Sequence, residues 1–127
     1  MSRARFLSLQ GGALAAALCF AALTARGENA ATPVVNPFEG RADLVDDGRS
    51  LFNQYCAHCH GTNAFQGDRS RDLRRLKLRY QARAAAVFYE TVSNGRLQKG
   101  MPVWKSVLSD DALWEIFTFL ETVQTPS

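Results

Sequence analysis

Apolar and small residues recur with a helical period between residue 43 and the first cysteine of the motif at residues 55–61. A helix over this stretch would carry Leu44, Gly48, Leu51, Phe52 and Tyr55 on one side. Asp43 and Asp46 are the candidate start positions, because acidic side chains are favoured in the first turn of a helix. We therefore predict a helix that runs from this start into the cysteines.

Two further stretches predict helices in the middle of the chain. Residues 71–80, RDLRRLKLRY, space three leucines as in a short helix, and residues 81–95, QARAAAVFYETVSNG, predict a longer one. The pair Asn94-Gly95 is typical of a helix end, where glycine takes up the left-handed backbone conformation. A turn-rich loop over residues 61–70 separates these stretches from the cysteines.

A last helix is predicted over residues 110–123, after a second loop that spans residues 96–108. Ser109 is placed to cap it, and its first turn is acidic. Its apolar positions fall at core spacing: Leu113, Ile116, Phe117, Leu120 and Val123. No segment alternates with period two, so the predicted fold class is all-α, with three or four short helices. Two long loops in so small a domain indicate that the loops wrap something.

The first 27 residues have the layout of a secretory signal peptide. Arg3 and Arg5 precede an uncharged run rich in Ala and Leu, and the small residues Ala25 and Gly27 favour cleavage after Gly27. The alternative is an uncleaved anchor, because about 20 uncharged residues could span a bilayer. The weak hydrophobicity of the run favours cleavage. We expect a periplasmic protein with no stable membrane insertion after cleavage.

Removal of residues 1–27 changes the charge and the cysteine content. Lys and Arg fall from 15 to 12, which balances the 12 Asp and Glu, so charge gives no support for nucleic-acid binding. Cys19 is lost as well, and the two remaining cysteines cannot build a disulfide framework. Residues 28–42, with two prolines, predict an extended N-terminal arm. This leaves residues 43–127 as one small domain with a limited core.

The motif YCAHCHG, residues 55–61, could serve a redox dithiol, a zinc site or a covalently attached haem. Cys56, Cys59 and His60 fit C-x-x-C-H, in which the thiols bond the porphyrin vinyl groups and the histidine becomes the proximal axial iron ligand. The chain lacks the βαβ pattern of a dithiol enzyme and the second ligand pair of a structural zinc site. We predict one haem c, with His58 exposed in the variable part of the motif.

Met101 is the one methionine after residue 27, and it lies in the turn KGMPVWK. Its thioether is the candidate distal axial ligand, and the alternative is a flexible core side chain. His/Met ligation leaves no open iron position, which favours an electron carrier over an enzyme. The alternative function is a haem enzyme or gas sensor with an open or labile sixth position. No second histidine or distal acid–base pair supports it.

CAHCHG, KGMPVWK and the pairing of the first and last helices make residues 43–123 resemble class I cytochromes c. The resemblance implies the small cytochrome c fold, in which these two helices cross almost at right angles. Gly48 would lie at the crossing, with Phe119 packed against it. Many members have a proline soon after the motif, whereas this chain has Thr62. The resemblance therefore does not identify the acceptor of the His60 N–H.

The segments NPFEG, LFNQYCAHCHG, RDLRRLKLRY and KGMPVWKSVLSDDALWEI also resemble those of soluble periplasmic cytochromes that accept electrons from quinoprotein (PQQ-dependent) alcohol dehydrogenases. This resemblance implies such a dehydrogenase as donor, a downstream cytochrome or terminal oxidase as acceptor, and a monomeric carrier. The basic run over residues 69–83 is either a docking or propionate-pairing face or a solvated surface. The sequence leaves both interpretations open.

Overall fold

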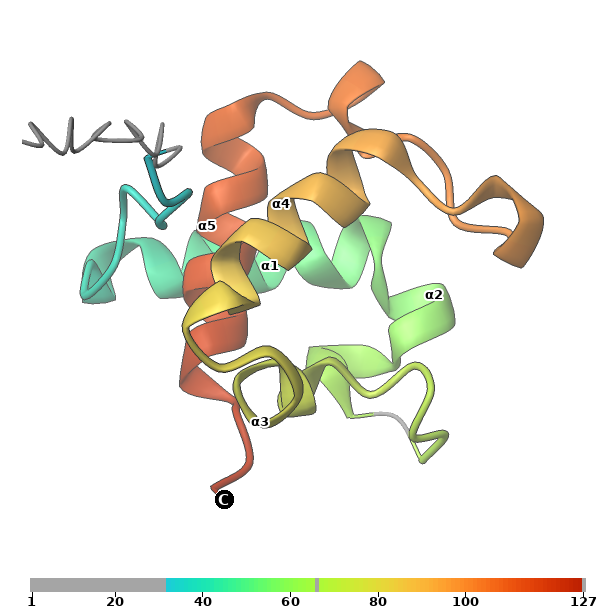
Figure 1. Cartoon of the computed structure of the whole chain (residues 1–127), viewed down its shortest axis with the longest axis horizontal. Helices are drawn as coiled ribbons and strands as arrows, with labels where there is room; N and C mark the ends of the chain where they lie inside the picture. The colour runs from blue at the N-terminus through green and yellow to red at the C-terminus, as the bar shows by residue number, and fades with distance from the viewer. Residues whose placement is uncertain (1–31, 66, 127) are drawn as a thin grey trace, which may run out of the picture. The chain divides into compact units, whose positions relative to one another are not determined.

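The structure, a computed structural model, describes residues 32–65 and 67–126. Its α-helices are α1 (Val45–Tyr55), α2 (Ala57–His60), α3 (Leu76–Tyr80), α4 (Ala84–Asn94) and α5 (Asp110–Thr122) (Figure 1). No strand occurs within the described residues, which confirms the all-α prediction. The predicted signal peptide and the beginning of the predicted arm, residues 28–31, lie outside the described residues.

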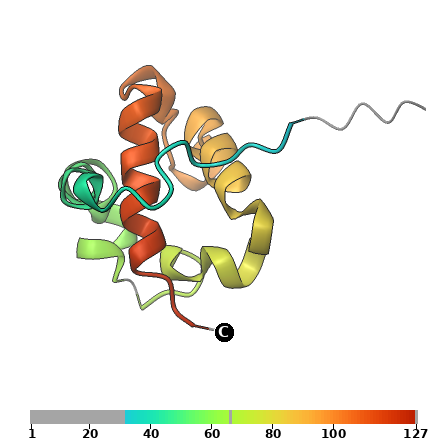
Figure 2. The same cartoon turned by 90° about the vertical axis from the view of Figure 1, so that its left-hand side faces the viewer.

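α1 crosses α5, as Figures 1 and 2 show from two directions, and the two backbones come close together at a glycine of α1. Gly48 is buried, and a Cβ atom on it would overlap the carbonyl oxygen of Glu115 and lie 2.6 Å from the carbonyl carbon. One turn further along α1, the ring of Phe52 packs on Phe119 with centroids 5.5 Å apart. Both rings are fully buried. These contacts confirm the close approach at Gly48, and they place the Phe119 ring against Phe52, one turn further along α1.

α4 packs against α5 mainly through aromatic rings. The rings of Phe88 and Phe117 have centroids 4.8 Å apart, and Tyr89 stacks on Trp114 at the same centroid distance with planes only 2° apart. Ser109 begins α5 by accepting the Ala112 N–H at 3.2 Å, as predicted. The core therefore lies between α1, α4 and α5.

α3 is shorter than the sequence pattern predicted. A 3-10 turn, η3 (Leu73–Arg75), replaces the expected first helical turn, and Gln81 ends the helix with φ +50°. The following turn, η4 (Gln81–Arg83), leads into α4. The pattern of leucines was compatible with either helix type, since both bring residues three apart to one side.

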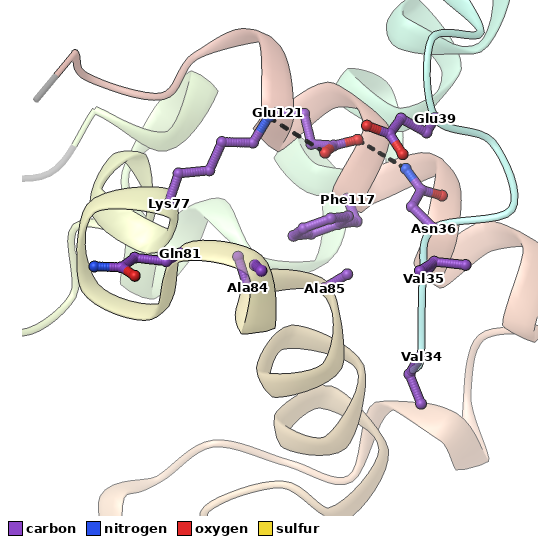
Figure 3. Close-up of a pocket in the computed structure, with 11 residues that line it drawn as sticks. Val34, Val35, Asn36, Glu39, Lys77, Gln81, Ala84, Ala85, Phe117 and Glu121 are labelled. Carbon is purple, nitrogen blue, oxygen red and sulfur yellow. Dashed lines mark hydrogen bonds and ion pairs between the residues drawn. The ribbon is translucent and has the colours of Figure 1, made fainter. Parts of the chain in front are cut away.

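The N-terminal segment after residue 31 is tied to α5 by a buried amide (Figure 3). Asn36 Nδ2 donates to Thr118 Oγ1 at 3.0 Å and to Glu121 Oε2 at 2.9 Å. Lys77 Nζ lies 3.5 Å from the other carboxylate oxygen of Glu121. One carboxylate thus links the N-terminal segment, α5 and α3 beside the pocket that Figure 3 displays. None of the described helices is long and apolar enough to cross a membrane.

Candidate haem-binding site

One helical turn carries the whole C-x-x-C-H motif. Cys56 is the residue between α1 and α2, and its carbonyl oxygen accepts the N–H groups of Cys59 at 3.2 Å and of His60 at 3.0 Å. Residues three and four apart share one face of a helix, so the two thiols and the imidazole lie on the same side. This arrangement is what attachment of one flat macrocycle by two thioethers beside an axial histidine requires.

The His60 ring has a defined hydrogen-bond partner. Its Nδ1 lies 2.8 Å from the carbonyl oxygen of Arg71. Because a carbonyl only accepts, Nδ1 must carry the proton, and in the neutral ring the lone pair is then at Nε2. Metal-bound histidines are oriented in this way by an acceptor at the other ring nitrogen. The Arg71 carbonyl is therefore the acceptor of the His60 N–H, for which the resemblance to class I cytochromes c identified no residue.

The turn after His60 is held by a side chain of α1. Asn53 Oδ1 accepts the Asn63 N–H at 2.8 Å, and Asn53 Nδ2 donates to Asn63 Oδ1 at 2.9 Å. Asn63 and Ala64 have φ values of +54° and +66°, which are unusual for residues other than glycine. Ala64 is fully buried. Sequence patterns do not predict this pair, and the one local indication is the short polar residue Asn63, two positions after Gly61.

Met101 lies at the end of a closed loop. Arg96 N–H donates to the Met101 carbonyl at 2.9 Å, and Met101 N–H donates back to the Arg96 carbonyl at 3.1 Å. Gly95 ends α4 with φ +67°, and a Cβ atom there would lie 2.8 Å from the carbonyl carbon of Pro102. Met101 is half-buried and packs against the edge of the core. The loop thus fixes where the predicted distal ligand lies.

The surroundings of Cys56 disfavour a reactive thiolate and are compatible with an uncharged thioether. Burial, and secondarily the neighbouring Cys59, raise the pKa of the Cys56 thiol to about 12. Redox dithiols and thiolate–metal sites need the deprotonated form, whereas a thioether carries no charge and loses little on burial. Within residues 32–65 and 67–126, no group of three or more His, Cys, Asp or Glu side chains could hold a metal ion. The described residues therefore fit a haem and contain no four-ligand zinc site.

Much of the basic run over residues 69–83 is used inside its own segment. Arg74 grips Asp72 with two hydrogen bonds of 3.0 and 3.1 Å, and its guanidinium carbon lies 4.5 Å from the centroid of the Phe65 ring. Arg79 donates to the carbonyl oxygen of Arg69. The side chains of Arg69 and Arg83 are exposed, and so is His58, as expected. Some side chains of the basic run thus bond to other groups of the same segment, and others are exposed to solvent.

The comparisons with known proteins agree with this site. The family model described as "Cytochrome C oxidase, cbb3-type, subunit III" matches residues 43–120. The chain is also 36% identical over 94 residues to "Cytochrome c550" of Pseudomonas aeruginosa, an alignment that covers 72% of this chain and 63% of that protein. The chain thus spans less than two thirds of the length of that relative. No solved structure matches the chain. The chain belongs to the c-type cytochrome family described as cbb3-type cytochrome c oxidase subunit III, whose members carry covalently bound haem c.

Proposed function

We propose that this chain is a one-haem electron-transfer protein rather than an enzyme. In this proposal Cys56 and Cys59 hold the haem through thioethers, and His60 and Met101 are its proximal and distal axial ligands. When bound, the haem supplies an iron that exchanges single electrons between the ferrous and ferric states. The observation that carries the proposal is the 2.8 Å hydrogen bond between His60 Nδ1 and the Arg71 carbonyl, because it directs Nε2 to serve as a ligand.

The Met101 loop supports a permanently ligated iron. The paired hydrogen bonds between Arg96 and Met101 and the tight contact of Gly95 with Pro102 fix the backbone on both sides of the methionine. A ligand on a fixed loop needs little ordering when it binds, so it competes well with water or added ligands. With His60 and Met101 both held in this way, a bound haem would offer no open iron position to a substrate.

The test of this proposal is the spectrum of the purified holoprotein with and without carbon monoxide. We expect the weak near-infrared band of a sulfur–ferric iron bond in the wild type, and no rapid change when carbon monoxide is added to the reduced form. Met101→Ala should lose the band, bind carbon monoxide and lower the reduction potential, since a thioether favours ferrous iron. Val103→Ala, in the same loop, is the matched control and should behave as the wild type does. A Met101→Ala spectrum like that of the wild type would assign Met101 to the core, and rapid carbon monoxide binding by the wild type would support the alternative, an enzyme or sensor with an open or labile sixth position.

We further propose that the electron donor is a quinoprotein alcohol dehydrogenase and that electrons pass on to a downstream cytochrome or terminal oxidase. The segments from NPFEG to KGMPVWK support this donor through their resemblance to its known acceptors. The exposed Arg69 and Arg83 offer a positive surface for docking, and charge complementarity acts mainly on the association rate. Reduction by the dehydrogenase with alcohol should be fast and should slow as salt rises.

Charge reversal tests this partner directly. Arg69→Glu and Arg83→Glu should slow reduction by the dehydrogenase, whereas Arg41→Glu, an exposed control on the other side of the motif in sequence, should not. Equal rates with an unrelated periplasmic reductase would reject the dehydrogenase as the specific donor. We also propose export to the periplasm with cleavage after Gly27, so the mass of the mature chain should correspond to a start at Glu28.

A further inference from the structure

We propose that Asp72 is a positioning residue for His60, because its buried carboxylate fixes the peptide group whose carbonyl oxygen accepts the imidazole N–H. The inference rests on the proposed role of His60 as the proximal ligand. It assigns a function to a residue that contacts neither His60 nor the haem attachment points through any described hydrogen bond. Asp72 acts through the peptide bond that it shares with Arg71.

Asp72 is buried in a segment whose other charges are mostly exposed. It is 7% exposed, and the other buried polar residues of the described chain are Asn36 and Thr118. Its Oδ1 accepts the backbone N–H of Arg74 and the Arg74 Nε, each at 3.0 Å, and its Oδ2 accepts Arg74 Nη2 at 3.1 Å. Three hydrogen bonds thus fix this carboxylate, and the charged ones are of the stronger kind.

Asp72 is linked to His60 through the planar peptide group that joins Arg71 to Asp72. The carbonyl oxygen of Arg71 and the Cα atom of Asp72 lie in one planar peptide unit. A fixed Asp72 therefore restricts the direction in which the Arg71 carbonyl points. That carbonyl meets His60 Nδ1 at 2.8 Å.

The residues that precede the Arg71 carbonyl hold it less firmly than Asp72 does. Residues 67–71 are exposed, and the turn before Arg71 is closed by Ser70 N–H to Asp68 Oδ1 at 2.8 Å and by Arg71 N–H to the Asp68 carbonyl at 3.0 Å. No proline stands between residues 38 and 101 to stiffen the backbone. The buried anchor of the acceptor is therefore on the Asp72 side.

The C-terminal residues reinforce this anchor from outside. Gln124 Nε2 donates to the Leu73 carbonyl at 2.9 Å, and Thr125 N–H donates to the Arg74 carbonyl at 2.8 Å. Gln124 Oε1 also accepts the Lys77 N–H at 3.0 Å. The residues directly after Asp72 are thus hydrogen-bonded on one side to the residues that follow α5 and on the other to the Asp72 carboxylate.

The experiment compares two variants that alter the local charge in opposite directions. Asp72→Asn removes a negative charge, and Arg74→Gln removes a positive one, but both break the charged grip. Loss of the His60 N–H acceptor makes the imidazole a weaker donor to the iron, which disfavours ferric iron and raises the potential. Positioning therefore predicts a rise of potential in both variants. A purely electrostatic influence predicts a rise for Asp72→Asn and a fall for Arg74→Gln.

The direct readout is the His60 Nδ1 proton, followed by NMR in the reduced holoprotein. Its exchange with solvent should become faster in both variants, because the ring N–H loses the acceptor that protects it from water. Arg74→Lys keeps the charge and loses the two-bond grip, so it should give a smaller change in the same direction. It also provides a milder variant if Asp72→Asn does not fold.

The pair Arg41–Asp43 is a matched control. It has the same spacing and also two hydrogen bonds, of 2.8 and 2.6 Å, but it is exposed and lies before α1. Asp43→Asn should leave the His60 proton and the potential unchanged. Unchanged His60 exchange in the Asp72 and Arg74 variants, or potential shifts of opposite sign, would overturn the inference. A wild-type His60 resonance without the shift caused by a bound haem would reject the proposed ligand itself, and the inference with it.

Discussion

The ring of Tyr55 meets the indole of Trp104 edge-on, with centroids 5.9 Å apart and ring planes at 71°. Tyr55 directly precedes the first cysteine of the haem motif, and Trp104 follows Met101 by three residues, in the turn η6 (Trp104–Ser106). The contact therefore joins the segment that carries the thiols and His60 to the loop that carries the candidate distal ligand. Edge-to-face aromatic pairs contribute about 0.5–1.5 kcal/mol beyond the area that they bury.

Loss of the Trp104 ring should therefore loosen the Met101 loop. We expect Trp104→Leu to lower the free energy of unfolding by about 1–2 kcal/mol, since it removes the ring pair and part of the packing. Its near-infrared band should weaken, and the reduced protein should bind carbon monoxide faster. Trp104→Phe keeps an aromatic edge and should lie close to the wild type in all three measurements. Equal effects of the two substitutions would show that the ring contact does not hold the loop.

Gly95→Ala should disturb Met101 from the α4 side. The added methyl group would lie 2.8 Å from both the carbonyl carbon and the carbonyl oxygen of Pro102, and the backbone at Gly95 has φ +67°. The loop would have to move away from α4, so we expect a larger fraction of the protein to lose its near-infrared band. Carbon monoxide binding to the reduced form measures the same displacement.

Gly100→Ala separates backbone strain from displacement. Gly100 also has a positive φ of +77°, but a Cβ atom there meets nothing within 4 Å. It should cost about 1 kcal/mol of stability, as alanine does in the left-handed region, and leave the axial ligand in place. Similar loss of ligation in both variants would assign the effect to strain alone.

The main helices could be predicted because their stabilising features are written in local sequence. Ser109 with the acids after it, and the apolar spacing of α5, specify the start and the buried face of that helix. The role of Gly48 at the crossing was expected only from the resemblance to class I cytochromes c, in which a glycine lies where these two helices meet. α3 was predicted too long because nothing in its leucines reports the positive φ of Gln81, which depends on how the chain turns into α4.

In the candidate haem site, the ligand side chains could be predicted from the sequence, but the groups that orient them could not. Cys56, Cys59, His60 and Met101 are side chains whose chemistry and spacing identify them as candidates. The acceptor for His60 is the backbone carbonyl of Arg71, and any residue type could supply such a group. The grip of Asp72 on Arg74 and the docking of Gln124 on Leu73 likewise depend on tertiary packing between distant segments. Sequence patterns therefore find ligands more readily than the groups that orient them.

The pH dependence of stability should contain a contribution from Glu115. Partial burial, and then the nearby Asp47 and Asp111, raise the pKa of Glu115 above its ordinary value of 4.5. The folded state then binds this proton more tightly than the unfolded state, so stability falls as pH rises from 4.5 through the folded pKa. At neutral pH the cost is fully present, and Glu115→Gln should be more stable than the wild type there.

Unfolding by denaturant at several pH values measures this contribution. The advantage of Glu115→Gln should shrink as the pH falls and disappear below about 4.5, where the glutamate is protonated in both states. Glu90→Gln, at an exposed position of α4, should show no comparable gain at neutral pH. A pH-independent advantage of Glu115→Gln would indicate altered packing rather than a charge effect.

Gly48→Ala tests the crossing on which the site depends, because α1 delivers Cys56 directly from this contact. In an isolated helix the change would stabilise by about 1 kcal/mol. Here the methyl group would overlap the Glu115 carbonyl oxygen, which belongs to the rigid backbone of α5. Overpacking costs about 1–3 kcal/mol in ordinary cores and more where nothing can move, so the overlap outweighs the gain in helix propensity. We expect a net loss of about 3 kcal/mol, which lowers the melting temperature of a domain of this size by roughly 10 °C or more.

Gly67→Ala, where a Cβ atom meets nothing within 4 Å, should shift stability by less than about 0.5 kcal/mol. Thermal unfolding of the two holoproteins makes the comparison, and a Gly48→Ala protein as stable as the wild type would mean that α1 and α5 do not touch at this residue.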